Sequence, residues 1–386
     1  MFKKVFAAML AGLFISAPAF AEVKMNGSFF IKGHANQSKD GNDYSYYESD
    51  FEVKTDFIVN ENTSAKLVVE AFDEDWVSSP KANAYKNDFD AQNSLQVTTA
   101  TMTHKFATDT TFTGGVAPNR DSWGTLFGDN ADKNYFVQVE QALPFGTLVL
   151  KNEKIEEGLT TDDDLDQDGY LLGFTANAGD LSIMPAIYYN DDQKNDKEEA
   201  RFMVAVTGKL GAISIESEFG YADFSNDNDN KAEGSVFGAW VDAGTTVGGL
   251  SVNLGILYAG ADDKSVYVVG DELAPMDILG DDVTLDGSSL VRVKLGKTIT
   301  EKVSVDTSLA YAFTNVDKDY IGEDDPTFGT AYYYDSVYEL DVNAYYKASD
   351  AVTLSTGVAY LDGDNADESS FEDARYDAYA KINVAF

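Results

Sequence analysis

The chain ends in the stretch ARYDAYAKINVAF, residues 374–386. Successive side chains of a β-strand point to opposite faces, so a strand here carries one apolar face and one polar face. The apolar face has an aromatic residue near each end, and the chain stops on an aromatic with no polar tail. Membrane-spanning strands have aromatics at both interfaces. The pattern predicts the closing strand of a transmembrane β-barrel, with an apolar face formed by Tyr376, Ala378, Ala380, Ile382, Val384 and Phe386.

The other end of the chain has the features of a secretory signal. Lys3 and Lys4 precede an apolar run over residues 5–15, and Ala19-Phe20-Ala21 supplies small residues at both positions of a cleavage site. A retained membrane helix would need about 20 apolar residues, and this run is shorter. We therefore expect Sec-type export, with a signal peptide over residues 1–21 and a mature chain over residues 22–386.

Composition narrows the class further. The chain has no cysteine and, beyond the signal, no apolar run long enough for a membrane helix. A barrel needs neither, because its strands require only about 9–11 alternating residues. The formal net charge of −38 argues against a nucleic-acid partner, whose phosphates need Lys and Arg. The same charge favours a lumen that attracts small cations or a surface that binds divalent cations.

Connections of two lengths alternate strictly along the mature chain. Eight short and nine long connections predict eighteen strands, with sixteen as the nearest alternative. An all-β, antiparallel, up-and-down transmembrane barrel produces this alternation, with short periplasmic turns at one rim and long extracellular loops at the other. Both termini then lie at the periplasmic rim. The short connections fall near 60–63, 107–109, 143–146, 179–180, 210–211, 247–249, 299–302 and 349–351, and the long ones near 36–45, 77–92, 118–134, 157–168, 191–198, 225–232, 261–286, 317–335 and 362–372.

The period-two alternation also separates wall residues into two faces. A charged side chain costs little in a water-filled lumen, whereas Arg or Lys at the lipid midplane costs about 2–4 kcal/mol. We therefore assign the charged positions of the strands to the lumen. The predicted pore-wall residues are Lys54, Glu70, Glu140, Arg201, Arg292, Lys294, Asp306, Glu339 and Asp341.

With its signal peptide, interleaved turns and acidic loops, lack of cysteine and terminal Phe386, the chain resembles the Gram-negative outer-membrane porins. It looks like a general diffusion porin, and its eighteen predicted strands are similar to those of the major outer-membrane protein type. The resemblance implies a multi-pass protein of the cell outer membrane, contact with lipopolysaccharide, a homotrimer, and Phe386 as an assembly signal. It also implies that the third long loop, about 118–134, folds into the lumen as a constriction. Its candidate residues are Arg120, Asp121, Trp123, Phe127, Asp129 and Asp132.

One acidic loop contains half of a calcium-binding motif. Asp164, Asp166 and Asp168 precede Gly169, and alternate carboxylates followed by glycine match the start of a calcium loop. The twelfth position of that motif should be a bidentate acid and is Thr175 here. The sequence therefore leaves two interpretations, a Ca²⁺ site and a solvated acidic loop. No other cofactor is predicted.

Catalysis has little support in the sequence. The only histidines are His34, near the top of the first predicted strand, and His104, near the bottom of the fourth, so much of the barrel height separates them. Neither adjoins a serine nucleophile motif. We expect no enzyme activity and instead a water-filled channel for passive diffusion of small hydrophilic solutes and ions, with a preference for cations. The alternatives are a substrate-specific channel for sugars or carboxylates, and a secreted all-β binding protein.

Overall fold

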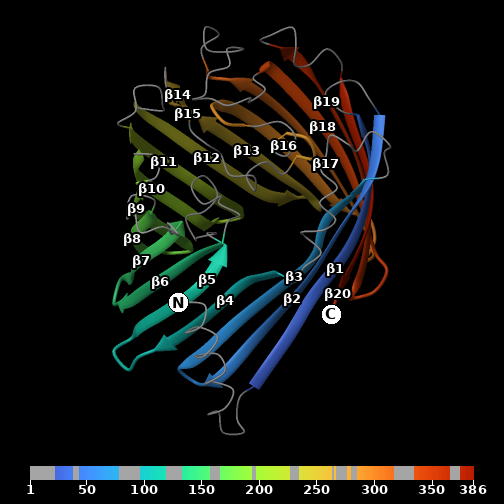
Figure 1. Ribbon diagram of the computed structural model, residues 1–386. Coiled ribbons are helices and arrows are strands. Elements are labelled where there is room, and N and C mark those ends of the chain that lie inside the picture. Colours follow the sequence, from blue (N-terminus) through green and yellow to red (C-terminus); the bar gives the residue numbers. More distant parts are fainter. Residues whose placement is uncertain are drawn as a thin grey trace.

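The computed structural model describes residues 22–37, 43–77, 96–118, 133–156, 166–193, 197–226, 234–262, 265–266, 276–279, 285–316, 334–365 and 374–386. These residues form an antiparallel sheet of eighteen strands that closes on itself as a barrel (Figure 1). The eighteen-strand prediction is confirmed, and the sixteen-strand alternative is wrong. The predicted signal peptide, residues 1–21, lies outside the described residues.

The barrel is a simple meander in which each strand pairs with the next and the last pairs with the first. Two very short strands, β14 (Ala261–Asp262) and β15 (Ser265–Val266), form a separate hairpin, so β13 pairs directly with β16. The barrel strands are β1 (Glu22–Gln37), β2 (Asp43–Asn60), β3 (Thr63–Val77), β4 (Gln96–Lys105), β5 (Thr110–Pro118), β6 (Lys133–Leu143), β7 (Gly146–Glu156), β8 (Gln167–Ala178), β9 (Leu181–Asp192), β10 (Lys197–Leu210), β11 (Ile213–Asn226), β12 (Gly234–Val247), β13 (Leu250–Ala259), β16 (Ser288–Thr298), β17 (Val303–Thr314), β18 (Tyr334–Lys347), β19 (Val352–Asn365) and β20 (Arg375–Ala385).

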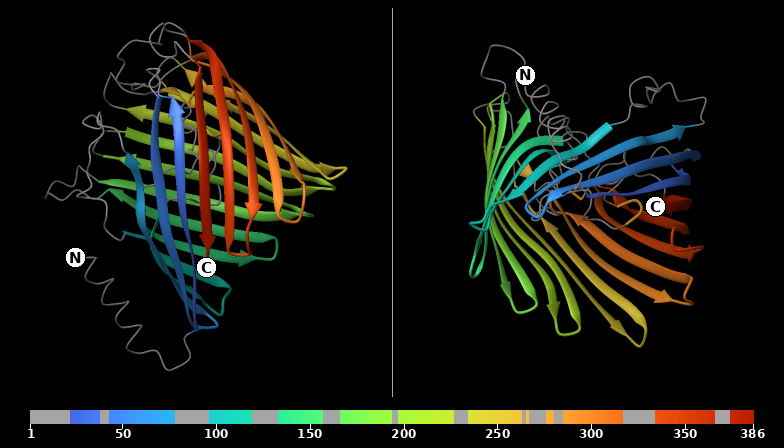
Figure 2. Two further views of the ribbon diagram at one scale, coloured as in Figure 1. Left: turned by 90° about the vertical axis from the view of Figure 1, so that its right-hand side faces the viewer. Right: turned by 90° about the horizontal axis from the view of Figure 1, so that it is seen from below.

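Tight turns join the strands at one rim. Several use residues with positive φ, such as Gly248 at 59° and Gly249 at 80° between β12 and β13. Two consecutive positive φ values match the twist of a two-residue hairpin, and glycine adopts them without steric cost. The turn positions follow the short connections predicted from the sequence. The strands β1 and β20 respectively begin and end at this rim, so both ends of the described chain lie there (Figure 2).

The seam between β1 and β20 closes the barrel. The two strands pair from Ser28 opposite Ala385 to Asn36 opposite Asp377, and they run side by side in Figure 2. At the lower end, the N–H of Gly27 donates to the carbonyl of Phe386 at 2.8 Å, and the N–H of Phe386 donates back at 3.0 Å. The Phe386 ring stacks on Phe51 with centroids 6.1 Å apart. A Cβ on Gly27 would lie 2.6 Å from the Phe386 ring, so the seam requires glycine there.

The two faces of the wall differ as the alternation predicts. In β18 the residues Tyr338, Leu340 and Val342 are 41–47% exposed, whereas Glu339 and Asp341 between them are buried. Exposed apolar side chains on one face and buried charged side chains on the other reverse the pattern of a soluble protein. The outer face is therefore suited to lipid. The described residues include no helix long and apolar enough to cross a bilayer.

Apolar clusters also occur inside the barrel. One joins inward residues of β11 to β19, among them Trp240, Leu257 and Leu361, with residues of the connection between β13 and β16. The described residues that this connection contributes are Met276, Ile278, Leu279 and Leu285. A second cluster lies on β7 to β10 and consists of Val149, Leu171, Met184, Ala186, Met203 and Ala205, with Tyr188 packed against it. The lumen is therefore lined unevenly, with apolar surface on part of the wall and charge elsewhere.

Deletion of Phe386 tests the seam. It removes two backbone hydrogen bonds and one aromatic contact from the place where the sheet closes, so we expect the yield of folded barrel to fall severely. The matched control is deletion of residues 366–371, a stretch of the connection between β19 and β20. Heat-modifiable migration on a gel measures the folded fraction of each variant. Equal losses in the two variants would contradict the importance of the seam contacts.

Candidate functional site: the charged lumen wall

All nine predicted pore-wall residues lie on the inward face, and five of them come together on three neighbouring strands. The strand register places Arg292 of β16 in one row with Glu339 of β18, with Ala310 between them, and Lys294 in the next row with Asp341. Asp306 of β17 lies 3.5 Å from Lys294, measured from carboxylate to ammonium. This part of the wall therefore carries both signs of charge in close proximity. The functional role of these residues stays a prediction.

The other four predicted residues are dispersed around the barrel, each with a local partner. Lys54 pairs with Glu52 at 2.8 Å on β2, and Arg201 pairs with Glu199 at 2.6 Å on β10. The carboxylates of Glu70 and Glu140 accept hydrogen bonds at 3.0 and 2.6 Å. Their donors are Thr98 and Gln138 respectively. The alternation of side chains along a strand predicts which face each residue occupies, but it does not predict which residues of different strands lie close together.

Arg292 lies in a buried polar group on β12, β13 and β16. Its Nη2 donates to Asp242 at 2.5 Å and to Asn253 at 3.1 Å, and its guanidinium lies 5.6 Å from the Trp240 ring centroid. The side chain is nearly inaccessible, and its Nε and Nη1 have no hydrogen-bond partner within the described residues. A guanidinium has five N–H donors, so this one keeps unused capacity for an acceptor.

Glu339 is the most deeply buried acid of the wall, with 0% of its surface exposed. Its two oxygens accept the backbone N–H groups of Ile278 and Leu279 at 2.8 and 2.6 Å. These residues belong to the segment Met276–Leu279, in the connection between β13 and β16. The carboxylate thereby fastens this segment to the inner wall. Asp277, which precedes Ile278 in this segment, is half-buried, and burial raises the pKa of its carboxyl.

A second group of charges spans the seam of the barrel. His34 of β1 places Nδ1 3.3 Å from both carboxylate oxygens of Asp377 on β20, and Nε2 3.1 Å from Glu48 on β2. Its ring stacks on Tyr46 with centroids 4.4 Å apart and planes inclined by 4°. Only a doubly protonated imidazole can donate to both carboxylates. The three strands that meet at the closure are therefore joined by one side chain.

Lysines and aromatic rings extend this group along the lumen. Lys32 lies 3.9 Å from Glu48 and 4.9 Å from the ring centroid of Tyr379, and Lys381 lies 3.5 Å from the ring centroid of Phe30. A cation over an aromatic face gains electrostatic stabilisation. The Tyr379 hydroxyl donates to Asn343 of β18 at 2.8 Å. That bond links the seam group to the charged wall of β16 to β18, and together we call them the lumen charge cluster.

The predicted constriction residues in 118–134 cannot be placed, because residues 119–132 lie outside the described residues. These are Arg120, Asp121, Trp123, Phe127, Asp129 and Asp132. The described segment that does pack against the inner wall is Met276–Leu279, which sequence reasoning did not single out. The sequence signal that could have identified it is the apolar group Met276, Ile278 and Leu279, because a connection that packs against an inner wall needs apolar side chains.

The half calcium motif is only partly described, since Asp164 lies outside. Asp166 and Asp168 both face Lys154 of β7, whose ammonium lies 2.5 and 3.2 Å from their carboxylates. In the described ranges, no group of three or more His, Cys, Asp or Glu side chains is arranged to hold a metal ion. A lysine between the two carboxylates competes with a cation, so Ca²⁺ binding here stays a prediction with an identified competitor.

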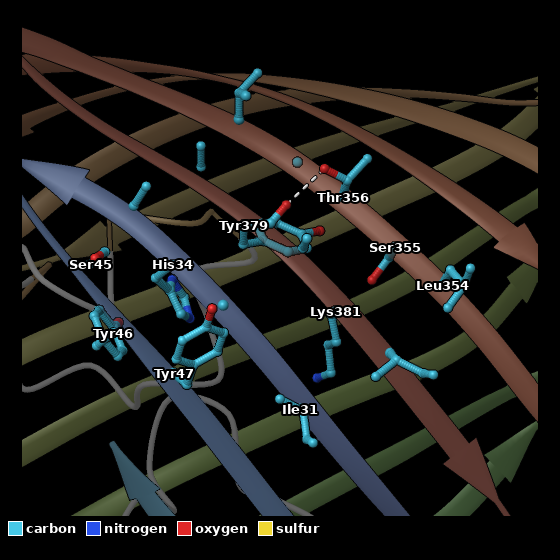
Figure 3. A pocket seen from close by; sticks show the side chains of 17 residues that line it. Ile31, His34, Ser45, Tyr46, Tyr47, Leu354, Ser355, Thr356, Tyr379 and Lys381 are labelled. Carbon is cyan, nitrogen blue, oxygen red and sulfur yellow. Dashed lines mark hydrogen bonds between the residues drawn. The ribbon is translucent and has the colours of Figure 1, made fainter. Parts of the chain in front are cut away.

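The outer face of the seam has a groove of about 700 Å³ across β19, β20 and β1. Its outward-facing floor consists of small residues, including Gly33, Ala378 and Ala380, and Figure 3 shows Tyr47 and Leu354 at its borders. The hydroxyl of Thr356 in this groove donates to the carbonyl of Tyr379 at 2.8 Å. Most of the outer wall carries large apolar side chains, so this region is locally hollow and smooth.

Comparison with solved structures identifies the fold. The outer membrane protein OprD from Pseudomonas aeruginosa matches with a TM-score of 0.61 at 9% identity, over 94% of this chain and 93% of that one. Pseudomonas aeruginosa OpdK with vanillate matches at 0.59 and 10% identity, over 94% and 98%. Acinetobacter baumannii OccAB1 matches at 0.58 and 13% identity, over 94% and 96%. No protein-family model and no curated protein matches the chain. The chain therefore has the fold of Gram-negative outer-membrane porins.

Replacement of His34 by alanine tests the seam group. It leaves the buried carboxylate of Asp377 without its partner, whereas Glu48 keeps Lys32 nearby, and breaking a buried ion pair costs about 3–5 kcal/mol. We expect the temperature at which the folded band disappears from a gel to fall clearly. The matched control is His104→Ala, because His104 contacts Thr63 at 2.8 Å near the tight-turn rim and forms no ion pair with a carboxylate within the described residues. A loss of about 1 kcal/mol is expected there; equal losses would contradict the role of the seam group.

Proposed function

We propose that this chain forms a water-filled channel in the outer membrane, through which small hydrophilic solutes and ions diffuse passively. The observation that carries the proposal is the closed eighteen-stranded sheet with an apolar outer face and a charged inner face. Such a sheet satisfies all its backbone groups by strand pairing and so can reside in lipid. Its partly exposed inner charges, such as Lys54 and Glu52, are inexpensive because a water-filled lumen solvates them.

The electrostatics support a preference for cations. The net charge of the sequence is −38, and inward carboxylates such as Glu48 and Glu52 are partly exposed on the described wall. Acidic walls raise the local concentration of small cations. The acidic connections at the opposite rim from the tight turns are suited to divalent ions that bridge lipopolysaccharide, which we propose as the partner on that side.

Single-channel recording in a planar bilayer tests the channel directly. We expect discrete conductance steps from the purified protein, and a reversal potential of cation-selective sign in a KCl gradient. Closures in groups of three would indicate a trimer. A folded, heat-modifiable preparation that never conducts would contradict the proposal.

A substrate-specific channel is the second candidate. Arg292 has buried N–H groups without a partner among the described residues, and an arginine fork is well suited to carboxylates. The fold is also similar to that of a protein whose structure was solved with vanillate, an aromatic carboxylate. Conductance block by added sugars or carboxylates at low concentration distinguishes this candidate from a general pore, which would show no saturable block.

The remaining alternative, a secreted soluble binding protein, is disfavoured by the outer face. Side chains such as Leu309, Val358 and Ile187 are each more than half exposed. Water contact over such a surface would cost about 25 cal/mol per Å² of apolar area. We also propose no enzyme activity, because both nitrogens of His34 already face carboxylates and His104 is bonded to Thr63.

We further propose a homotrimer whose contacts include the groove across β19, β20 and β1. Small side chains let neighbouring barrels approach closely, and the groove offers Gly33, Ala378 and Ala380. Ala380→Trp would fill it. We expect most of the protein to shift from trimer to monomer in light scattering of the detergent-solubilised sample. The control is Ala239→Trp on the outer face of β12, between Phe219 and Tyr258. A trimer retained in both variants would place the interface elsewhere.

A further inference from the structure

The segment Met276–Leu279 is held against the inner wall by two kinds of contact. Glu339 binds the N–H groups of Ile278 and Leu279, one with each carboxylate oxygen. Each of these two backbone N–H to carboxyl-oxygen hydrogen bonds makes a modest net contribution to stability. Because Glu339 is fully buried, water does not compete for these bonds. The backbone of the segment is therefore fixed relative to β18.

Apolar packing supplies the second contact. Met276, Ile278 and Leu279 are at most 5% exposed and belong to the cluster that contains Trp240 and Leu361. Three of the four residues in the segment are thus turned into the wall. Asp277 is the exception, since it is half-buried and polar. The anchoring of its neighbours determines where its carboxylate can lie.

The charged groups around Asp277 come from several wall strands. Its carboxylate interacts electrostatically with Lys32 of β1, Asp377 of β20, Asp306 of β17 and Lys294 of β16. These strands form a contiguous part of the wall on both sides of β18 and β19. Asp277 therefore lies within electrostatic range of charged groups from both halves of the lumen charge cluster.

The wall charges that face Asp277 have partners of their own. Lys294 pairs with Asp306 at 3.5 Å, Asp377 with His34 at 3.3 Å, and Lys32 lies 3.9 Å from Glu48. Asp277 has no salt bridge to any described residue, and its Oδ2 is buried without a hydrogen-bond partner there. Paired charges largely cancel at a distance, whereas an unpaired charge acts on every ion that passes.

We propose that Asp277 is the selectivity-determining residue of this pore and that Glu339 is the positioning residue that holds it in the lumen. This inference rests on the proposed channel function. Asp277 provides a fixed negative charge beside the ion path, which lowers the energy of a passing cation and raises that of an anion. Glu339 contributes through the backbone of the two following residues and contacts no solute.

Reversal potentials in a KCl gradient test the role of Asp277. We expect Asp277→Asn to reduce the cation-to-anion permeability ratio by about threefold or more, equivalent to about 0.7 kcal/mol. The matched control is Asp350→Asn, which removes the same charge from an exposed turn at the rim, where Asp350 pairs with Lys347. The control should leave the ratio unchanged. If the wild-type protein conducts and both variants keep its ratio, the proposal is wrong while the channel function stands.

Glu339→Gln tests the positioning role. Glutamine has nearly the same shape but one acceptor oxygen, so at most one of the two N–H groups remains bound and the other faces an NH₂ donor. We expect the permeability ratio to move toward that of Asp277→Asn although Asp277 is intact, together with greater open-channel noise. In the double variant Asp277→Asn/Glu339→Gln, the ratio should equal that of Asp277→Asn alone.

A second variant keeps the test decisive if Glu339→Gln folds poorly. Glu339→Asp retains both acceptor oxygens on a side chain shorter by one methylene, so it should preserve more of the selectivity than any neutral replacement. Heat-modifiable migration establishes that each recorded protein is folded. Additive effects of the Asp277 and Glu339 substitutions, or a wild-type ratio in both Glu339 variants, would overturn the positioning role.

Discussion

The pairing of the first strand with the last is the constraint on which the rest of this structure depends. Lipid offers no hydrogen-bond partners, so every backbone N–H and C=O within the bilayer must be bonded inside the protein. A sheet meets that requirement only when it has no free edge. The seam from Gly27 opposite Phe386 to Asn36 opposite Asp377 removes the last edge. The even strand count, the shared rim of both ends and the separation into two faces all follow from this closure.

Closure also decides which distant residues meet inside. His34 and Asp377 are 343 positions apart in the chain, yet they face each other across the seam. The hydrogen bond between Tyr379 and Asn343 extends this group of contacts to β18. Charges in the lumen are therefore organised as neighbouring pairs on adjacent strands. Such pairs stabilise the wall locally, and they leave the field in the lumen to be determined by charges that lack a partner.

The connection between β13 and β16 contributes such a charge because its packing combines two interactions. Its apolar residues fill space beside inward Trp240 and Leu361, and its backbone N–H groups bind Glu339. A buried carboxylate without partners would be very costly. Glu339 of the wall thus accepts hydrogen bonds from the backbone N–H groups of the segment, and neither group is left without a partner. The inner wall beneath the segment would otherwise present an apolar patch and a bare carboxylate to water.

By itself, the sequence determined the barrel, its strand number and the face of each wall residue. Period-two alternation and turn residues are local signals, and a membrane strand obeys them strictly because each error would place charge in lipid. Only the tertiary structure decided which inward charges meet. Glu48 has the same parity as Lys54, so alternation places it inside, but its contact with His34 depends on the pairing of β1 with β2. The Met276–Leu279 segment was missed because its position depends on Glu339, some sixty residues later, and on a wall assembled from several strands. Contacts between residues so far apart leave no periodic trace in the sequence; they arise when the closed sheet brings its strands together around a common lumen.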